Sequence, residues 1–168
     1  VIIHHGVDTD FFRPRPFSAA LAGPLGINAA QPVAVFLGTT YSFSGLDGVV
    51  RNLPRLRAAL PGFTLLVVGA GEQDGLLRML AWHNGPAGAL VQAGQRPYAE
   101  LPDLLAVAAI GLLPFLINDI TRDIIPIKVL QYLACGRPVV AAPLPDLVRL
   151  FPETTSGVVY ADSANPAA

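Results

Sequence analysis

Residues 118–140 read NDITRDIIPIKVLQYLACGRPVV, and the order of elements in this stretch indicates the fold of the whole chain. A polar loop leads into a predicted helix at Ile125–Cys135. Gly136 follows it, and glycine is typical of the turn that ends a helix. Residues Pro138–Ala142 then read as a short buried strand. A helix followed directly by a buried strand is the repeating unit of an α/β sheet.

The start and the inner face of this helix can be predicted from residue types. Pro126 suits the first helical turn, because the N–H that proline lacks has no partner there. Asp123 is a candidate side-chain cap for the turn before the helix. Ile127, Leu130 and Ala134 recur at helical spacing, so we expect them to pack against the sheet.

Polar and basic side chains gather near the start of the same helix. A helix N-terminus presents unpaired N–H groups and a partial positive charge, which suits a phosphate. Arg122 and Lys128 would add charge-assisted hydrogen bonds, and Gln131 neighbours Lys128 on the helix surface. This pattern predicts an anion site. The competing interpretation is an ordinary surface, where two cations beside a helix start are common.

The rest of the chain alternates buried strands with helices. The predicted strands lie at 32–38, 63–68, 89–93, 110–113, 138–142 and 157–160, and the predicted helices at 46–60, 72–82, 98–108, 125–135 and 144–151. Strands that are apolar on both faces and separated by helices indicate a parallel sheet. The predicted fold class is therefore α/β: a doubly wound parallel sheet of about six strands with helices on both faces.

Ligands of such a sheet bind outside the carboxyl ends of the strands. The loops at those ends are 38–44, 69–73, 94–98 and 114–125. Thr39 and Thr40 offer hydroxyl and N–H groups for a phosphate or a sugar hydroxyl, with capping of the next helix as the alternative. Arg96 lies at the tip of the third strand, where a solvated side chain is the alternative.

A glycine-rich loop, Gly69-Ala70-Gly71, connects the second strand to the next helix. A dinucleotide-binding loop would follow the first strand, with an acidic residue about 20 positions later. Here the loop follows the second strand, and the third strand ends Val91-Gln92-Ala93 without an acid. NAD binding is therefore disfavoured against a tight turn or a close backbone approach to another ligand.

Composition limits the possible partners. The 168 residues are 52% hydrophobic and 14% charged with a net charge of −1, which gives no electrostatic reason to expect nucleic acid. Cys135 is the single cysteine, which excludes an internal disulfide and a cysteine-based zinc site. No apolar run approaches the ~20 residues of a membrane span. With no secretory signal visible either, we expect a cytoplasmic location.

The opening of the chain differs from the rest. Val1–Ile3 reads as a strand end that runs into a turn, and His4 and His5 would point to opposite faces, which disfavours a shared metal. Residues 13–32 have the proline and glycine content of a linker or surface loop. The chain starts in mid-pattern without a methionine, so we expect a domain cut from a longer protein.

Five stretches resemble the C-terminal, nucleotide-sugar-binding domain of GT-B glycosyltransferases of family 4, the glycosyl transferases group 1 type. They are VIIHHGVDTDFFRP, VAVFLG, TLLVVGAGE, ELPDLLAVAAIGLLPF and IPIKVLQYLACGRPVVAAPLPDL. The last is the most distinctive, because it matches the family pattern P-x-K-x-x-E-Y-x-A-x-G-x-P-V-V. The likeness covers nearly the whole chain.

The resemblance implies transfer of a sugar from a nucleoside diphosphate sugar to an unknown acceptor. It divides the chain into an inter-domain segment and linker at 1–31 and a Rossmann-like, nucleotide-sugar-binding half of a GT-B fold at 32–168. The acceptor and the catalytic residues would come from the protein's own N-terminal domain, so no catalytic residue is expected here and the domain alone should be inactive. Retention of configuration, no metal and no cofactor are also implied. In the full-length protein, the inner face of the membrane is an alternative location.

The same resemblance assigns roles to residues. The donor diphosphate would contact Thr39, Thr40, Arg122, Ile125 and Lys128; the ribose and base Gly71, Arg96 and Gln131; and the sugar Asn118, Thr121 and Asp123.

The chain departs from the family pattern at two places. The family's paired glutamates are matched by Asp123 and Gln131, and the loop 39–44 lacks the family's arginine and lysine. Losing two charged hydrogen bonds to phosphate, each contributing about 1.5–3 kcal/mol, would weaken the binding of the donor. A catalytically degenerate binding domain is therefore an alternative, and a sugar-nucleotide 2-epimerase of the same architecture is another.

Overall fold

The computed structural model describes residues 6–161 of the chain. The predicted strand end at Val1–Ile3, with His4 and His5, lies outside the described residues, as do residues 162–168.

Six strands form one parallel sheet, which confirms the predicted fold class. The strands are β1 (Val33–Leu37), β2 (Thr64–Val68), β3 (Leu90–Gly94), β4 (Ile110–Leu113), β5 (Val139–Ala141) and β6 (Val158–Tyr160). Their order in the sheet is β3-β2-β1-β4-β5-β6, and every neighbouring pair is parallel. The order reverses between β1 and β4, so the carboxyl ends of these two strands flank the crevice where a doubly wound sheet binds its ligand.

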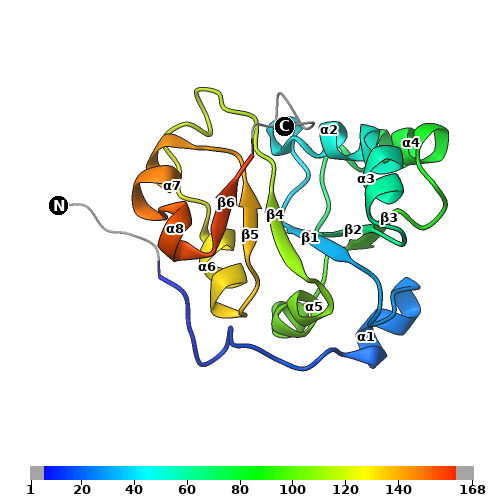
Figure 1. Ribbon diagram of the computed structural model, residues 1–168, viewed down its shortest axis with the longest axis horizontal. Helices are drawn as coiled ribbons and strands as arrows, with labels where there is room; N and C mark the ends of the chain where they lie inside the picture. The colour runs from blue at the N-terminus through cyan, green and yellow to red at the C-terminus, as the bar shows by residue number, and fades with distance from the viewer. Residues whose placement is uncertain (1–5, 162–168) are drawn as a thin grey trace.

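Helices connect the strands. They are α1 (Ala19–Ala22), α2 (Leu46–Arg51), α3 (Leu53–Ala59), α4 (Asp74–Asn84), α5 (Leu101–Val107), α6 (Ile127–Ala134), α7 (Pro145–Leu150) and α8 (Glu153–Ser156), with 3₁₀ turns at Gly23–Leu25, Ser42–Ser44 and Tyr98–Glu100. Figure 1 shows the strands in the middle of the molecule, α2, α3 and α4 grouped near β1–β3, and α6, α7 and α8 grouped beside β5 and β6.

Two hydrophobic cores lie on opposite faces of the sheet. Alternate residues of β1 divide between them: Val35 packs with residues of α5, α6 and α7, and Phe36 packs with residues of α2, α3 and α4. All five residues of β1 and all five of β2 are buried. Burial on both faces explains why these strands are continuous apolar runs rather than alternating ones.

Tyr132 determines how α6 packs. Its ring covers Gly111 of β4 so closely that a Cβ at Gly111 would overlap it, and its hydroxyl accepts a hydrogen bond of 2.7 Å from the Leu37 N–H. The buried apolar residues of α6 and its C-cap are consequently Val129, Tyr132 and Cys135. The prediction that Ile127, Leu130 and Ala134 form the sheet-packed face is wrong for Ile127 and Leu130, which are only partly buried, whereas Ala134 packs against the core.

The predicted end of α6 is confirmed, and its predicted start is wrong by two residues. Gly136 adopts φ 70, and the N–H groups of Gly136 and Arg137 donate to the carbonyls of Leu133 and Tyr132, the Schellman pattern. At the other end Pro126 is the N-cap, with ψ 123, and no side chain caps the helix. The residue before a proline is restricted to extended backbone, so Ile125 cannot be helical. Asp123 is exposed and does not act as the cap.

The single helix predicted at 46–60 is two helices, α2 and α3, separated at Asn52. Pro54 lies in the first turn of α3, and a proline inside a continuous helix would lose a hydrogen bond and clash with an earlier carbonyl. The Asn52 side-chain amide donates to the Gly48 carbonyl at 2.9 Å. The break therefore leaves this carbonyl satisfied.

Described residues before β1 pack onto the domain. Phe12, Ala22 and Ile27 are buried in the core that contains α5 and α6. Arg15 forms an ion pair of 2.9 Å with Asp103 of α5. The role of residues 1–31 as a link between two domains stays a prediction. Within residues 6–161, no helix has the length and apolar character needed to cross a membrane.

Candidate functional site

A pocket of about 250 Å³ opens at the carboxyl ends of β1, β2 and β3. Its lining comes from three loops and the start of α5: Leu37, Gly38, Thr39, Val68, Gly69, Ala70, Gln95, Arg96 and Leu101. Three of the four loops in which we expected a ligand therefore meet here. A concave site at this edge of the sheet is the usual ligand position of the fold.

Two glycines allow the first two loops to touch. A Cβ at Gly69, where φ is 137, would overlap the carbonyl oxygen of Gly38. A Cβ at Gly71 would lie 2.8 Å from both the N and the Oγ1 atoms of Thr40. The glycine-rich loop is thus required for close backbone packing between the β1 and β2 loops.

Acidic side chains hold the same two loops together. The Thr40 hydroxyl donates to Asp74 Oδ1 at 2.5 Å, and the Gly71 N–H donates to Asp74 Oδ2 at 3.1 Å. The Ser42 N–H donates to Glu72 Oε1 at 2.8 Å. The alternative role of the Thr39–Ser44 loop, capping the next helix, is not observed, since α2 has no side-chain cap. Thr40 is fully buried, so its hydroxyl serves Asp74, whereas Thr39 is exposed.

Lys128, from the first turn of α6, reaches the end of β1. Its Cε atom would lie 3.9 Å from a Cβ at Gly38. The Lys128 side chain is half-buried, and desolvation lowers its pKa from the usual 10.5. The first N–H groups of α6 have no intrahelical partner. A cation from the first turn of α6 therefore lies beside Gly38, and the sequence predicts a cation of this helix for an anion site.

Gln131, one turn further along α6, is 4% exposed, and its Oε1 atom has no hydrogen-bond partner among the described residues. An unpaired buried oxygen costs about 1–3 kcal/mol. A ligand hydroxyl that reaches this oxygen would remove that cost.

Replacing Gln131 with methionine should leave the protein as stable or up to about 1 kcal/mol more stable, because the unpaired oxygen disappears while the volume is kept. Gln31→Met is the matched control, since Gln31 Oε1 accepts from the Asn28 N–H at 2.7 Å and its loss should be slightly destabilising. Urea unfolding of both variants measures the difference. Clear destabilisation by Gln131→Met alone would show that the oxygen is paired.

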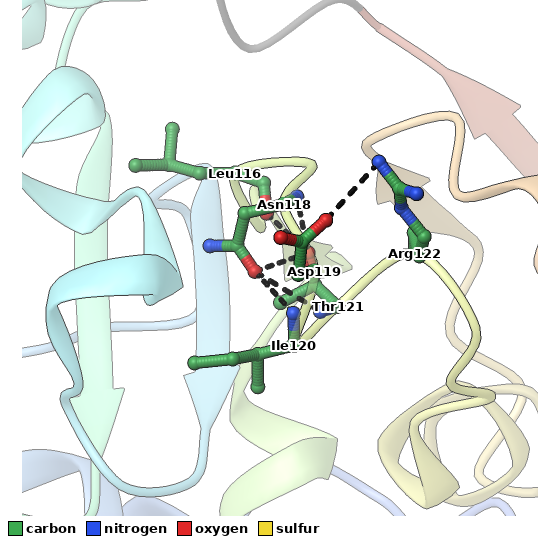
Figure 2. Close-up of polar contacts among 6 residues, drawn as sticks. All are labelled: Leu116, Asn118, Asp119, Ile120, Thr121 and Arg122. Atoms are coloured by element: carbon green, nitrogen blue, oxygen red, sulfur yellow. Dashed lines mark hydrogen bonds and ion pairs between the residues drawn. The ribbon is translucent and has the colours of Figure 1, made fainter.

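The residues predicted to contact the sugar build a separate turn (Figure 2). Asn118 Oδ1 accepts from the N–H groups of Ile120 and Thr121, and the Thr121 hydroxyl donates to the Leu116 carbonyl. The side chains of Asn118 and Thr121 are thus engaged within their own loop. Asp123, the third predicted sugar contact, is exposed.

The two predicted site arginines have acidic partners. Arg122 pairs with Asp119 at 3.2 Å, in the exposed turn of Figure 2. Arg96 lines the pocket and pairs with Glu100 at 2.7 Å. Ile125 is partly buried against the core that contains α6. Lys128 is therefore the predicted site cation for which the described residues provide no ion pair.

Other parts of the described surface are less suited to a phosphate. A hollow of about 180 Å³ between α2, α3, β4 and β5 has Asn52 as its one polar side chain. Within residues 6–161 no three His, Cys, Asp or Glu side chains are grouped to hold a metal ion. Metal independence stays a prediction.

Sequence reasoning missed Asp74, Glu72 and Tyr132. Asp74 begins α4 directly after the glycine-rich loop, and an acidic residue at that position is a usable signal, because such carboxylates accept backbone N–H groups. Tyr132 gave no signal, because its partners Leu37 and Gly111 are distant in the sequence.

The model of the family "Glycosyl transferases group 1" matches residues 31–168. A GDP-mannose-dependent alpha-(1-6)-phosphatidylinositol monomannoside mannosyltransferase of Mycolicibacterium smegmatis is 34% identical over 138 residues, which are 81% of this chain and 36% of that protein. The chain thus spans about a third of the length of this curated relative.

Solved structures share the fold. The C-terminal domain of a glycosyl transferase group 1 family protein of Francisella tularensis matches with a TM-score of 0.73 at 16% identity, covering 96% of this chain and 84% of that one. An Anabaena protein crystallised with UDP-glucose matches with a TM-score of 0.77 at 21% identity, covering 98% of this chain and 45% of that one. At these identities the likeness concerns the fold alone.

Proposed function

Because the chain belongs to the glycosyl transferases group 1 family and has the fold of a GT-B donor domain, we propose that it binds the nucleoside diphosphate sugar of a glycosyltransferase. The observation that carries this proposal is the position of Lys128, which comes from the first turn of α6 and lies beside Gly38 at the end of β1. The binding site lies between this point and the pocket formed by the loops of β1, β2 and β3.

Each part of the site has a chemical role in this proposal. Lys128 and the first N–H groups of α6 stabilise the negative charge of the diphosphate, which grows as it leaves the sugar. Gln131 accepts a hydrogen bond from a ribose hydroxyl, without the charge of a carboxylate. Arg96 and Gly71 lie beside the pocket on the base side. Asp123 remains the proposed side-chain contact of the sugar. Asn118 and Thr121, which we also predicted to contact the sugar, would instead shape the loop beside it.

The relatives' printed names supply two donors to test. The Mycolicibacterium relative is GDP-mannose-dependent, and the Anabaena structure contains UDP-glucose. We therefore propose a GDP- or UDP-linked hexose as donor. Transfer with retention, without a metal or a further cofactor, is part of the proposal, as is an N-terminal domain of the same protein that binds the acceptor and supplies the catalytic groups.

A binding domain that has lost catalysis is the second candidate. It is favoured by the ion pairs that occupy Arg96 and Arg122, and by a β1 loop that has no cation. Both candidates predict nucleotide binding, but only the first predicts turnover by the full-length protein.

Calorimetric titration of the chain with UDP and GDP tests the shared claim. We expect at least one of the two to bind in the micromolar to millimolar range, with NAD as the control that should not bind. If the folded chain binds neither UDP nor GDP at millimolar concentration, the donor-site proposal fails for this domain.

A further inference from the structure

Asp74 connects two of the pocket loops to each other and to strand β3. One carboxylate oxygen accepts from the Thr40 hydroxyl of the β1 loop, and the other accepts from the Gly71 N–H of the β2 loop. Its main-chain carbonyl accepts from the Gln92 side-chain amide of β3 at 3.1 Å. A fourth bond, from the Gln73 N–H to the Thr40 carbonyl at 3.1 Å, joins the first two loops again. We name these four hydrogen bonds the loop clasp.

The residues that directly precede Thr40 and Gly71, the two loop residues bonded to the Asp74 carboxylate, line the pocket. Thr39 comes just before Thr40, Ala70 just before Gly71, and both Thr39 and Ala70 line the pocket. Neither has a hydrogen-bond partner for its N–H among the described residues. Free backbone N–H groups at strand ends are common ligands of phosphate oxygens. Their positions depend on the loops that carry them.

We propose that Asp74 is a positioning residue, which fixes the Thr39 and Ala70 N–H groups for a phosphate of the bound nucleotide. This inference rests on the proposed donor site and assigns to it two backbone ligands and their support. It also bears on the absence of cations in the Thr39–Ser44 loop, because pre-positioned N–H groups supply part of the positive potential that side chains would otherwise provide.

The geometry favours a role of Asp74 in positioning the two loops over a role in general stability alone. Gly71 has no room for a side chain beside Thr40, and the Asp74 carboxylate bonds to both residues, so its loss removes a hydrogen bond from each loop. A phosphate ligand displaced by several tenths of an ångström loses much of its hydrogen bond. Losing the clasp should therefore weaken nucleotide binding by a folded protein.

Four variants test the role. Thr40→Val removes the hydroxyl, Asp74→Ala removes both carboxylate acceptors, Thr40→Ser keeps the hydroxyl, and Asp103→Asn breaks the distant ion pair with Arg15. Affinity for UDP and GDP is measured by calorimetry at a temperature where thermal unfolding shows each variant to be folded. We expect Thr40→Val and Asp74→Ala to bind about tenfold more weakly. Thr40→Ser should stay within about twofold, and Asp103→Asn should lose stability while keeping its affinity.

The outcomes separate the two proposals. If the unsubstituted chain binds neither nucleotide, the proposed function fails, and the role of Asp74 fails with it. If that chain binds while folded Thr40→Val and Asp74→Ala bind equally well, only the positioning role is wrong. Equal weakening by Asp103→Asn would likewise overturn it, because the loss would then follow from general destabilisation.

Discussion

Replacing Gly69 with alanine should destabilise the protein by about 3–5 kcal/mol and remove nucleotide binding. Two effects add. Gly69 has φ 137, a backbone conformation that side chains strongly disfavour. Its new Cβ would also overlap the Gly38 carbonyl oxygen and lie 2.8 Å from the Gly38 carbonyl carbon. Both obstacles are backbone atoms, which cannot move aside as a flexible side chain can.

Gly75→Ala is the matched control for this substitution. Gly75 lies six positions along the chain in α4, and a Cβ there meets nothing within 4 Å. Alanine in a helix is more favourable than glycine by up to about 1 kcal/mol. Thermal unfolding should show a loss of about 10 °C for Gly69→Ala and none for Gly75→Ala. Equal stability of the two variants would contradict the close packing of the β1 and β2 loops.

Replacing Lys128 with methionine should weaken UDP or GDP binding by about 10- to 100-fold, because a charged hydrogen bond to phosphate contributes about 1.5–3 kcal/mol. Methionine keeps the length and apolar stem that pack beside Gly38. Arg122→Met is the comparison, since Arg122 is exposed and paired with Asp119. Calorimetry should show the larger loss at Lys128. Unchanged affinity in Lys128→Met would remove this residue from the site.

The pH dependence of Lys128 adds a second readout. Burial lowers its pKa below 10.5, so between the lowered value and 10.5 the unfolded chain binds more protons than the folded one. Below this pH range the half-buried charge of Lys128 lowers the free energy of unfolding. That loss of stability disappears as pH rises from the lowered pKa to 10.5. Lys128→Met should therefore be no less stable than the unsubstituted chain at neutral pH. Nucleotide affinity of the unsubstituted chain should fall as pH rises through the lowered pKa, and the variant should lack that step.

Strands β1, β2 and β4 were predictable because each is a largely apolar run that is followed by a glycine or proline. Such a run between predicted helices indicates a buried strand of a covered sheet, and the observed parallel sheet agrees with that prediction. The end of α6 was predictable for a local reason, since Gly136 provides the left-handed turn. The site's location followed from the fold, because the carboxyl ends of parallel strands meet at one edge.

The inner face of α6 was not predictable, because spacing alone allows more than one apolar face. The choice depends on Tyr132, which fits over Gly111 and bonds to the Leu37 N–H, 95 residues away in the sequence. The bond between Thr40 and Asp74 also joins residues 34 positions apart. Side-chain hydrogen bonds at such separations depend on the tertiary fold, so residue types near each partner do not reveal them.

The same limit explains the turn at 118–123. Asn118 and Thr121 are polar residues before a helix, and their types suggest ligand contacts as readily as turn formation. In the structure both side chains form hydrogen bonds within their own loop. Residue types alone therefore did not distinguish side chains that form the turn from side chains that remain free for a ligand.

The central claim is that a nucleoside diphosphate binds where α6 begins, beside the end of β1. Amide NMR spectra of the isotopically labelled chain, recorded during titration with UDP and with GDP, test it most directly. The account predicts saturable shifts at Gly38, Thr39, Ala70 and Lys128, with Gly75 and Asp103 unaffected. Shifts confined to the apolar hollow around Val49 and Leu56, or no shifts at millimolar nucleotide, would contradict it.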